Sequence, residues 1–206
     1  MTARFQHRVA LITGGSSGIR RATALAFARE GATVVIAARS PKAGAEVLRE
    51  ITASVNTPVR FIPTDVTSAA DCQALVSSLM DSFGRLDVLV NNASYLGVVG
   101  GRGVAAYSAA KGAVVNLTRA MALGHAGDGI RVNCVAPGSV ETPMLRQEWE
   151  EMGGEALVRH LFEEKHPMGR ISQPEEIARV ILFLASPEAS FINGACIPVD
   201  AGITAG

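Results

Sequence analysis

The 206-residue chain contains 48% hydrophobic and 18% charged residues, proportions that are typical of a globular protein rather than a disordered one. Its 19 basic and 19 acidic residues cancel, which gives no electrostatic reason to bind nucleic acid or an acidic membrane surface. No apolar run reaches the roughly 18 residues of a membrane span, and the N-terminus shows no secretory signal. We therefore expect a cytoplasmic protein with one domain over residues 1–206 and no membrane partner.

Short apolar runs alternate with amphipathic stretches in the first part of the chain. This alternation predicts an α/β fold in which helices cover both faces of a parallel sheet. The predicted strands are residues 8–13, 33–37, 59–62 and 86–90, and the predicted helices are residues 19–29, 42–52 and 69–83. The later elements are a long helix over 104–123, a strand over 130–135, a charged helical stretch over 148–165, a helix over 174–184 and a strand over 195–199.

Cysteine and histidine spacing argues against a disulfide framework and a metal site. Cys72, Cys134 and Cys196 are odd in number and widely spaced, so we expect reduced thiols. The four histidines show neither HxxxH nor HExxH spacing, and we predict no protein-bound metal.

A glycine-rich turn, TGGSSGIR at residues 13–20, follows the first strand and opens the first helix. In this position such a turn cradles a pyrophosphate. Gly14 permits the tight turn, Gly18 lets the backbone approach the phosphates, and Ser16 and Ser17 can donate hydroxyl hydrogen bonds. A simple turn without a ligand is the alternative interpretation.

Tyr107 and Lys111 lie four residues apart in the predicted long helix, so their side chains share a face. A free tyrosine has a pKa near 10, and a neighbouring ammonium group favours the phenolate and lowers such a pKa. The pair therefore suits acid–base chemistry. A surface tyrosine beside a solvated lysine is the alternative.

Five motifs together resemble the short-chain dehydrogenase/reductase family. The turn at 13–20 resembles TGxxxGxG, VNNA at 90–93 resembles NNAG, and YSAAK at 107–111 is similar to YxxxK. Pro137-Gly138 followed by Thr142 resembles the family's nicotinamide loop, and VDAG at 199–202 resembles its ending. The resemblance implies a Rossmann-type doubly wound parallel sheet with a small helical substrate lid at about 144–168.

The resemblance also implies the roles of the site residues. Tyr107 would pass a proton to or from the substrate oxygen, Lys111 would hold the nicotinamide ribose, and a serine would hydrogen-bond the substrate. The family's catalytic serine precedes the tyrosine by thirteen positions, which gives Ser94. The implied cofactor contacts are Gly14, Ser16, Ser17, Gly18, Ile19, Arg39, Asp65, Val66, Asn91, Ala93, Tyr107, Lys111, Pro137, Gly138, Val140 and Thr142.

The end of the second strand favours NADP(H) over NAD(H). NAD-binding relatives usually place an acidic residue there, whereas this chain has Ala38 and then Arg39, whose guanidinium suits a phosphate. A solvated arginine at a loop edge is the alternative. Asp65 resembles an adenine contact, but it would also suit a cap of the following turn.

The chain departs from the family pattern at two places. Arg20 replaces the third glycine of the turn, and we expect it to weaken cofactor binding, although it could instead reach a phosphate. Ala93 and Ser94 are adjacent, whereas parallel strands need a crossover of a dozen residues or more. We therefore predict an internal deletion of roughly 45 residues that removes one strand and its crossover helix. That helix commonly forms part of the subunit interface, which leaves a homo-oligomer in doubt.

Two functions follow from these observations. The first is an NADP(H)-dependent oxidoreductase that interconverts a secondary alcohol and a ketone. The alternative is a catalytically impaired cofactor-binding remnant or deletion variant of such an enzyme. In the predicted lid, apolar side chains suit either an apolar substrate or helix packing; they are Leu145, Trp149, Leu157, Leu161 and Phe162.

Overall fold

The computed structural model describes residues 3–90 and 93–205, and its chain divides into two compact units, Met1–Asn91 and Asn92–Gly206. The organisation as one domain over residues 1–206 remains a prediction.

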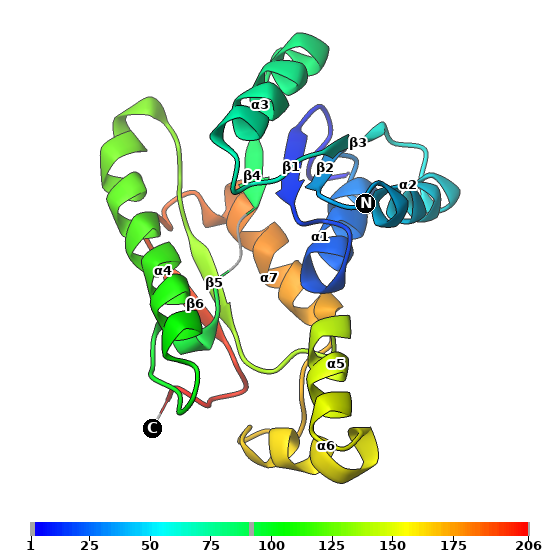
Figure 1. Cartoon of the computed structure of the whole chain (residues 1–206). Helices are drawn as coiled ribbons and strands as arrows, with labels where there is room; N and C mark the ends of the chain where they lie inside the picture. The colour runs from blue at the N-terminus through cyan, green and yellow to red at the C-terminus, as the bar shows by residue number, and fades with distance from the viewer. Residues whose placement is uncertain (1–2, 91–92, 206) are drawn as a thin grey trace. The chain divides into compact units, whose positions relative to one another are not determined.

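The first unit is a parallel sheet with helices between its strands (Figure 1). Its strand order, β3-β2-β1-β4, is that of one half of a doubly wound sheet, as the alternation in the sequence predicted. The elements are β1 (Val9–Thr13), α1 (Gly18–Arg29), β2 (Thr33–Ala38), α2 (Pro41–Ser54), β3 (Val59–Pro63), α3 (Ala69–Phe83) and β4 (Val88–Val90).

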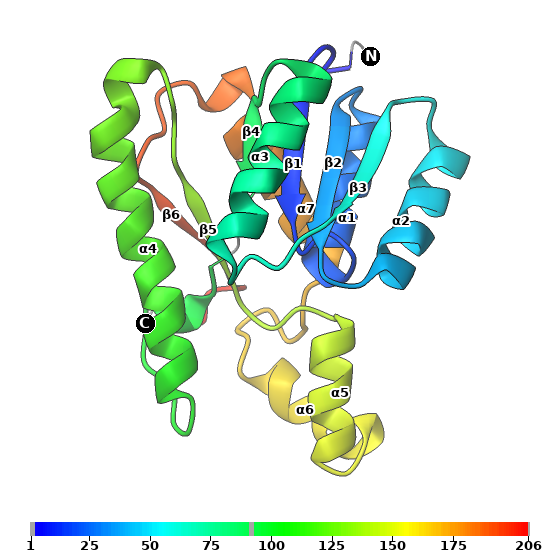
Figure 2. The same ribbon diagram turned by 45° about the horizontal axis from the view of Figure 1, so that its top comes forward.

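Both faces of β1 and β2 are covered, which explains why these two strands are almost entirely apolar. Leu75 and Leu79 of α3 pack against one face, where they contact Val9, Leu11 and Val35. The alternate strand residues point to the other face and are also buried, since side chains in a strand alternate between the two sides. Figure 2 shows α3 on one side of β1 and α1 on the other.

The second unit contains a two-stranded parallel sheet of β5 and β6, in which Cys134 lies opposite Cys196. Val115 of α4 packs with Cys134 and Ala93. None of the described helices has the length and apolar character that crossing a membrane requires. The elements are η1 (Tyr95–Gly97), α4 (Ala105–His125), η2 (Ala126–Asp128), β5 (Cys134–Pro137), α5 (Pro143–Glu151), α6 (Glu155–Glu164), α7 (Pro174–Ala185), η3 (Pro187–Ala189) and β6 (Cys196–Val199).

The strand predicted over residues 130–135 is wrong at its start, because β5 begins only at Cys134. Side chains replace the sheet ladder before that point. The Val132 N–H donates to Asn193 Oδ1 at 2.9 Å, and Asn133 Oδ1 accepts from the Ala195 N–H at 3.0 Å. Asn193 comes from a loop distant in sequence, and Asn133 of the segment itself bonds back to that loop, so no local pattern reveals the arrangement.

The helical stretch predicted over residues 148–165 consists of two helices, and the first begins earlier than expected. α5 starts at Pro143, with Thr142 as its N-cap. It ends before Gly153 and Gly154, whose φ angles of 112° and 104° interrupt the helix before α6. Such angles are accessible mainly to glycine.

The predicted gap in the sheet corresponds to the boundary between two separate ladders. β4 is an edge strand of the four-stranded sheet, and β5 belongs to the two-stranded sheet. Within residues 3–90 and 93–205, therefore, the sheet does not close by pairing these strands. Leu89 of β4 is 49% exposed, unusually high for an apolar strand residue.

Asp87 links the starts of β1 and β4, and its ionisation should control acid stability. Burial alone would raise the pKa of its carboxyl group, but hydrogen bonds from Arg85, Arg8 and the Val9 N–H lower this pKa from 3.8 to about 2. A lowered pKa stabilises the fold above pH 3.8, and this contribution disappears as the pH falls towards 2.

We expect Asp87→Asn to lower the free energy of unfolding at pH 7 by about 2 kcal/mol and to flatten the loss of stability between pH 4 and 2. Urea unfolding over a pH series measures both effects. Asp81→Asn, at an exposed position of α3, is the control. An equal loss in both variants would contradict the role of Asp87.

Candidate active site

The glycine-rich turn has the backbone geometry of an anion cradle. Gly14 has φ +65°, and its N–H donates to the Ala37 carbonyl at 2.6 Å. Gly18, with φ +55°, is the first residue of α1. Ser17 is the N-cap, yet its side chain makes no capping hydrogen bond. The first N–H groups of a helix have no partners within it, so this end of α1 can receive a phosphate.

Arg20 turns inward over this cradle. A Cβ atom on residue 14 would lie 1.9 Å from Arg20 Nη1, so the guanidinium rests directly against Gly14. Nη1 donates to the Thr13 carbonyl at 3.4 Å, a long hydrogen bond. The Arg20 side chain thus crowds the glycine-rich turn.

Two further residues of the first unit follow the carboxyl ends of strands. Arg39 comes directly after β2 and is exposed. Asp65 follows β3, and its carboxylate accepts from the N–H and hydroxyl of Thr67 at 3.0 and 2.8 Å. These bonds, followed by the positive charge of Arg39, lower the pKa of Asp65. Asp65 therefore caps its turn, while its contact with adenine remains a prediction, as does that of the exposed Val66.

Tyr107 and Lys111 lie one turn apart at the start of α4. Tyr107 is 42% exposed, and Lys111 Nζ lies 5.5 Å from the centroid of its ring. Tyr95 stands nearby: burial raises the pKa of its phenol, and the charges of Glu148 and Tyr107 raise it further. Sequence reasoning missed Tyr95, which sits in η1 beside the predicted catalytic serine.

Ser94 is held close to this helix by a glycine contact. It is 8% exposed and caps η1, with its Oγ accepting from the Leu96 N–H at 3.4 Å. A Cβ on Gly97 would lie 2.6 Å from the carbonyl carbon of Lys111 and 2.9 Å from the Gly112 nitrogen. Backbone therefore meets backbone between η1 and α4, and this brings the turn of Ser94 onto the helix of Tyr107 and Lys111.

The loop after β5 is fixed by backbone hydrogen bonds. The Gly138 N–H donates to the Val199 carbonyl at 3.1 Å, and Val140 is buried and bridges to Ser172. Thr142 Oγ1 caps α5 by accepting from the Leu145 N–H at 3.3 Å. The predicted cofactor residue Asn91 lies outside the described residues.

The lid helices have a small core of their own. Leu145, Trp149 and Phe162 pack with Val158 and Ile171. Helix packing therefore accounts for three of the five apolar lid residues. The other two, Leu157 and Leu161, are exposed. Arg159 of α6 pairs with carboxylates of Glu155, Glu163 and Glu141.

Comparison with known proteins agrees with this fold. A family model described as short chain dehydrogenase matches residues 8–97, and a related model, Enoyl-(Acyl carrier protein) reductase, matches residues 93–204. The chain belongs to the short-chain dehydrogenase/reductase family. The enzymes of this family are oxidoreductases that bind NAD(P)(H).

Two relatives similar in sequence are bacterial dehydrogenases. The chain is 36% identical to the meso-2,3-butanediol dehydrogenase of Serratia marcescens, with 98% of this chain and 96% of that protein covered. It is 35% identical to the cis-4-hydroxycyclohexanecarboxylate dehydrogenase of Sinomonas cyclohexanicum over the whole of both proteins. Among solved structures, the L-sorbose reductase from Gluconobacter frateurii, complexed with NADPH and L-sorbose, is similar with a TM-score of 0.94. That match has 27% identity and covers 98% of each chain, and it confirms the Rossmann-type fold.

The same alignments show that this short-chain dehydrogenase/reductase has fewer residues than its relatives, and that the difference lies within the chain. The alignment with the butanediol dehydrogenase runs over 251 positions, whereas the chain has 206 residues, so at least 45 positions of the relative face gaps. The two family models meet at residues 93–97, where the sequence predicts the junction.

The contact of Gly97 with α4 leads to a specific prediction. In Gly97→Ala, the new Cβ would meet the Lys111 backbone, which cannot move aside as a side chain does. We expect a loss of stability of about 1–3 kcal/mol, measured by thermal unfolding. Gly100→Ala is the matched control, because a Cβ there meets nothing within 4 Å. Equal melting temperatures of the two variants would contradict the close approach.

The position of Arg20 leads to a second prediction, about cofactor binding. Arg20→Gly should restore space in the cradle and tighten NADPH binding by roughly tenfold, or ~1.4 kcal/mol, as measured by fluorescence titration. Arg21→Gly removes the same charge one residue later, from a side chain that pairs with Glu50 instead, and serves as the control. Binding that is no tighter in Arg20→Gly would show that Arg20 does not obstruct the cofactor.

Proposed function

We propose that this chain is an NADP(H)-dependent oxidoreductase that interconverts a secondary alcohol and a ketone. The observation that carries this proposal is the close packing of η1 on α4. It brings the turn of Ser94 to the helix of Tyr107 and Lys111 through the Gly97 contact. In a remnant without function, we would not expect Ser94, Tyr107 and Lys111 all to be retained on two elements that contact each other.

Each of the three residues has a distinct task in this proposal. Tyr107 Oη gives a proton to the carbonyl oxygen of the ketone, or takes it from the alcohol. The ammonium of Lys111 holds the nicotinamide ribose. The hydroxyl of Ser94 donates a hydrogen bond to the substrate oxygen and so orients the reacting carbon. The cofactor, when bound, supplies or accepts the hydride.

The first unit offers residues that fit NADP(H). The positive φ angles of Gly14 and Gly18 and the uncapped N-terminus of α1 suit a pyrophosphate. Arg39 is exposed at the end of β2, and Ala38 before it provides no carboxylate for a ribose hydroxyl. The NADPH in the structure of the related L-sorbose reductase supports the same choice.

The substrate proposal is a small alcohol or ketone. Butanediol and hydroxycyclohexanecarboxylate, named for two relatives, both carry a secondary hydroxyl group. We also propose a single NAD(P)-binding domain with its lid at about 144–168, and a cytoplasmic location, which the three free cysteines support. A homo-oligomer would have to form without the usual interface helix.

A catalytically impaired remnant is the second candidate, and the interrupted sheet favours it. We propose that the segment missing relative to the relatives lies between Ala93 and Ser94. The meeting of the two family models at residues 93–97 supports this position. A lost strand exposes backbone groups at the edges beside it and removes apolar cover, which weakens the scaffold of a site.

Direct binding and turnover measurements separate the two candidates. We expect saturable NADPH binding by fluorescence, with Arg39→Ala weakening it by roughly tenfold or more while NADH binding changes little. Arg49→Ala, at an exposed position of α2, is the control. NADPH oxidation with a panel of cyclic and acyclic ketones should be abolished in Tyr107→Phe, which keeps its NADPH affinity.

Each outcome has a clear meaning. Binding with Tyr107-dependent turnover supports the oxidoreductase, and binding without turnover on any ketone supports the remnant. If neither NADPH nor NADH binds, both candidates are wrong. Turnover that persists in Tyr107→Phe would remove the proposed proton donor.

A further inference from the structure

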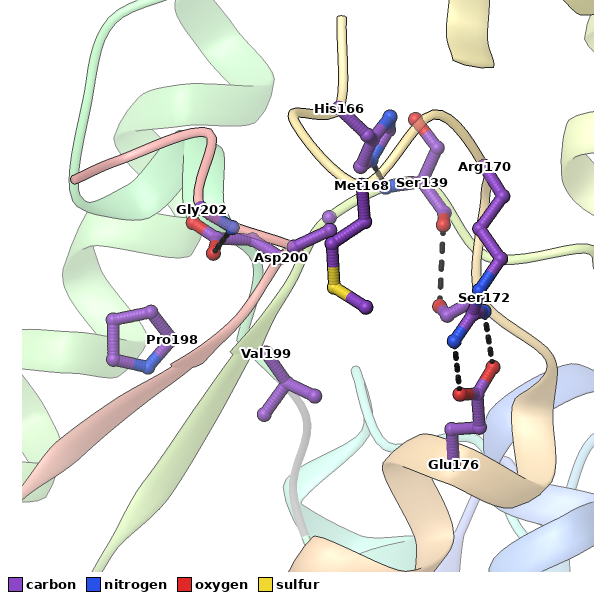
Figure 3. A pocket seen from close by; sticks show the side chains of 12 residues that line it. Ser139, His166, Met168, Arg170, Ser172, Glu176, Pro198, Val199, Asp200 and Gly202 are labelled. Atoms are coloured by element: carbon purple, nitrogen blue, oxygen red, sulfur yellow. Dashed lines mark hydrogen bonds and ion pairs between the residues drawn. The ribbon is translucent and has the colours of Figure 1, made fainter. Parts of the chain in front are cut away.

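His166 follows α6 and is almost completely enclosed, at 3% exposure. Its Nε2 lies 3.0 Å from the Ser139 nitrogen, and its Nδ1 lies 2.7 Å from the Phe162 carbonyl oxygen (Figure 3). The Ser139 N–H can only donate and the Phe162 oxygen can only accept. Nε2 must therefore be the acceptor and Nδ1 must carry the hydrogen, which specifies one neutral tautomer of the imidazole.

The ring also packs against the loop that follows β5. A Cβ on Gly138 would lie 2.8 Å from His166 Nε2 and 3.0 Å from Asp200 Cα, so only glycine fits between them. The neighbouring backbone is tied to Ser172, whose N–H donates to the Ser139 carbonyl at 3.1 Å. These groups line a cavity of about 290 Å³, shown in Figure 3.

We propose that His166 is a positioning residue, whose neutral imidazole holds the Pro137–Thr142 loop in the conformation that receives the nicotinamide end of the cofactor. The inference rests on the proposed function, because it assigns that loop its role. Without the Nε2 acceptor, the Ser139 N–H would lose its hydrogen bond and the loop would be released.

The charged side chains around the His166 ring interact with groups other than the ring. Asp200 accepts from the Gly202 N–H at 3.0 Å and from the Thr204 hydroxyl at 2.6 Å. In the cavity wall, Arg170 and Glu176 form a two-point ion pair at 2.9 and 2.8 Å. On α6, Glu163 pairs with Arg159, and beyond it the Lys165 ammonium lies 5.0 Å from the Phe162 ring. The ring nitrogens of His166 contact backbone groups instead.

Backbone hydrogen exchange in the cofactor-free chain tests this inference. Exchange of the 138–142 peptide is measured by mass spectrometry. In His166→Ala, which removes the acceptor of the Ser139 N–H, we expect roughly tenfold less protection than in the wild type. His166→Gln, whose amide oxygen can accept at the position of Nε2, should keep the protection of the wild type.

NADPH titration of the same proteins links the loop to the cofactor. The dissociation constant should rise roughly tenfold in His166→Ala and stay at the wild-type value in His166→Gln. His160→Gln, at an exposed position of α6, should behave like the wild type.

Unchanged protection in His166→Ala would overturn the inference, and so would a loss of protection in His166→Gln as large as in His166→Ala. A loosened loop with unchanged NADPH affinity would also overturn it, because His166 would then be only structural. If no protein binds NADPH at pH 8, the proposed function is wrong, and the exchange pattern alone decides whether His166 holds the loop.

Discussion

A parallel strand obtains its backbone partners only from strands that a crossover places beside it, and this requirement governs the whole chain. β1 satisfies it on both sides, between β2 and β4. β4 satisfies it on one side among the described residues, because the next strand along the chain belongs to a different ladder. The candidate cofactor turn therefore belongs to the unit with the four-stranded sheet, whereas the candidate proton-transfer residues belong to the unit with the two-stranded sheet.

The local geometry around Ser94 does not depend on pairing between β4 and β5. It depends on Gly97, which lets η1 touch the backbone of α4 beside Lys111. Both partners of this contact follow Ser94 in sequence and belong to the second unit. The contact therefore forms within that unit alone.

The sequence predicted the helices and strands that have periodic apolar residues. It missed the features that depend on contacts between residues distant in sequence. Strongly periodic elements such as α3 and β2 were located within a residue or two, since apolar spacing reports burial directly. The start of β5 was wrong because Asn193 competes for its backbone. The motif residues were found by resemblance, whereas Tyr95, Gly97 and His166 act through contacts that no spacing encodes.

The exposed edge of β4 has a consequence for the colloidal behaviour of the protein. Leu89 stands 49% exposed on a strand whose outer side has no ladder partner within the described residues. Open strand edges are templates for association, and net charge is the usual protection against it. With a calculated isoelectric point near 6.9, the chain carries almost no net charge at neutral pH. The conditions that suit most activity assays are therefore those in which its molecules repel one another least.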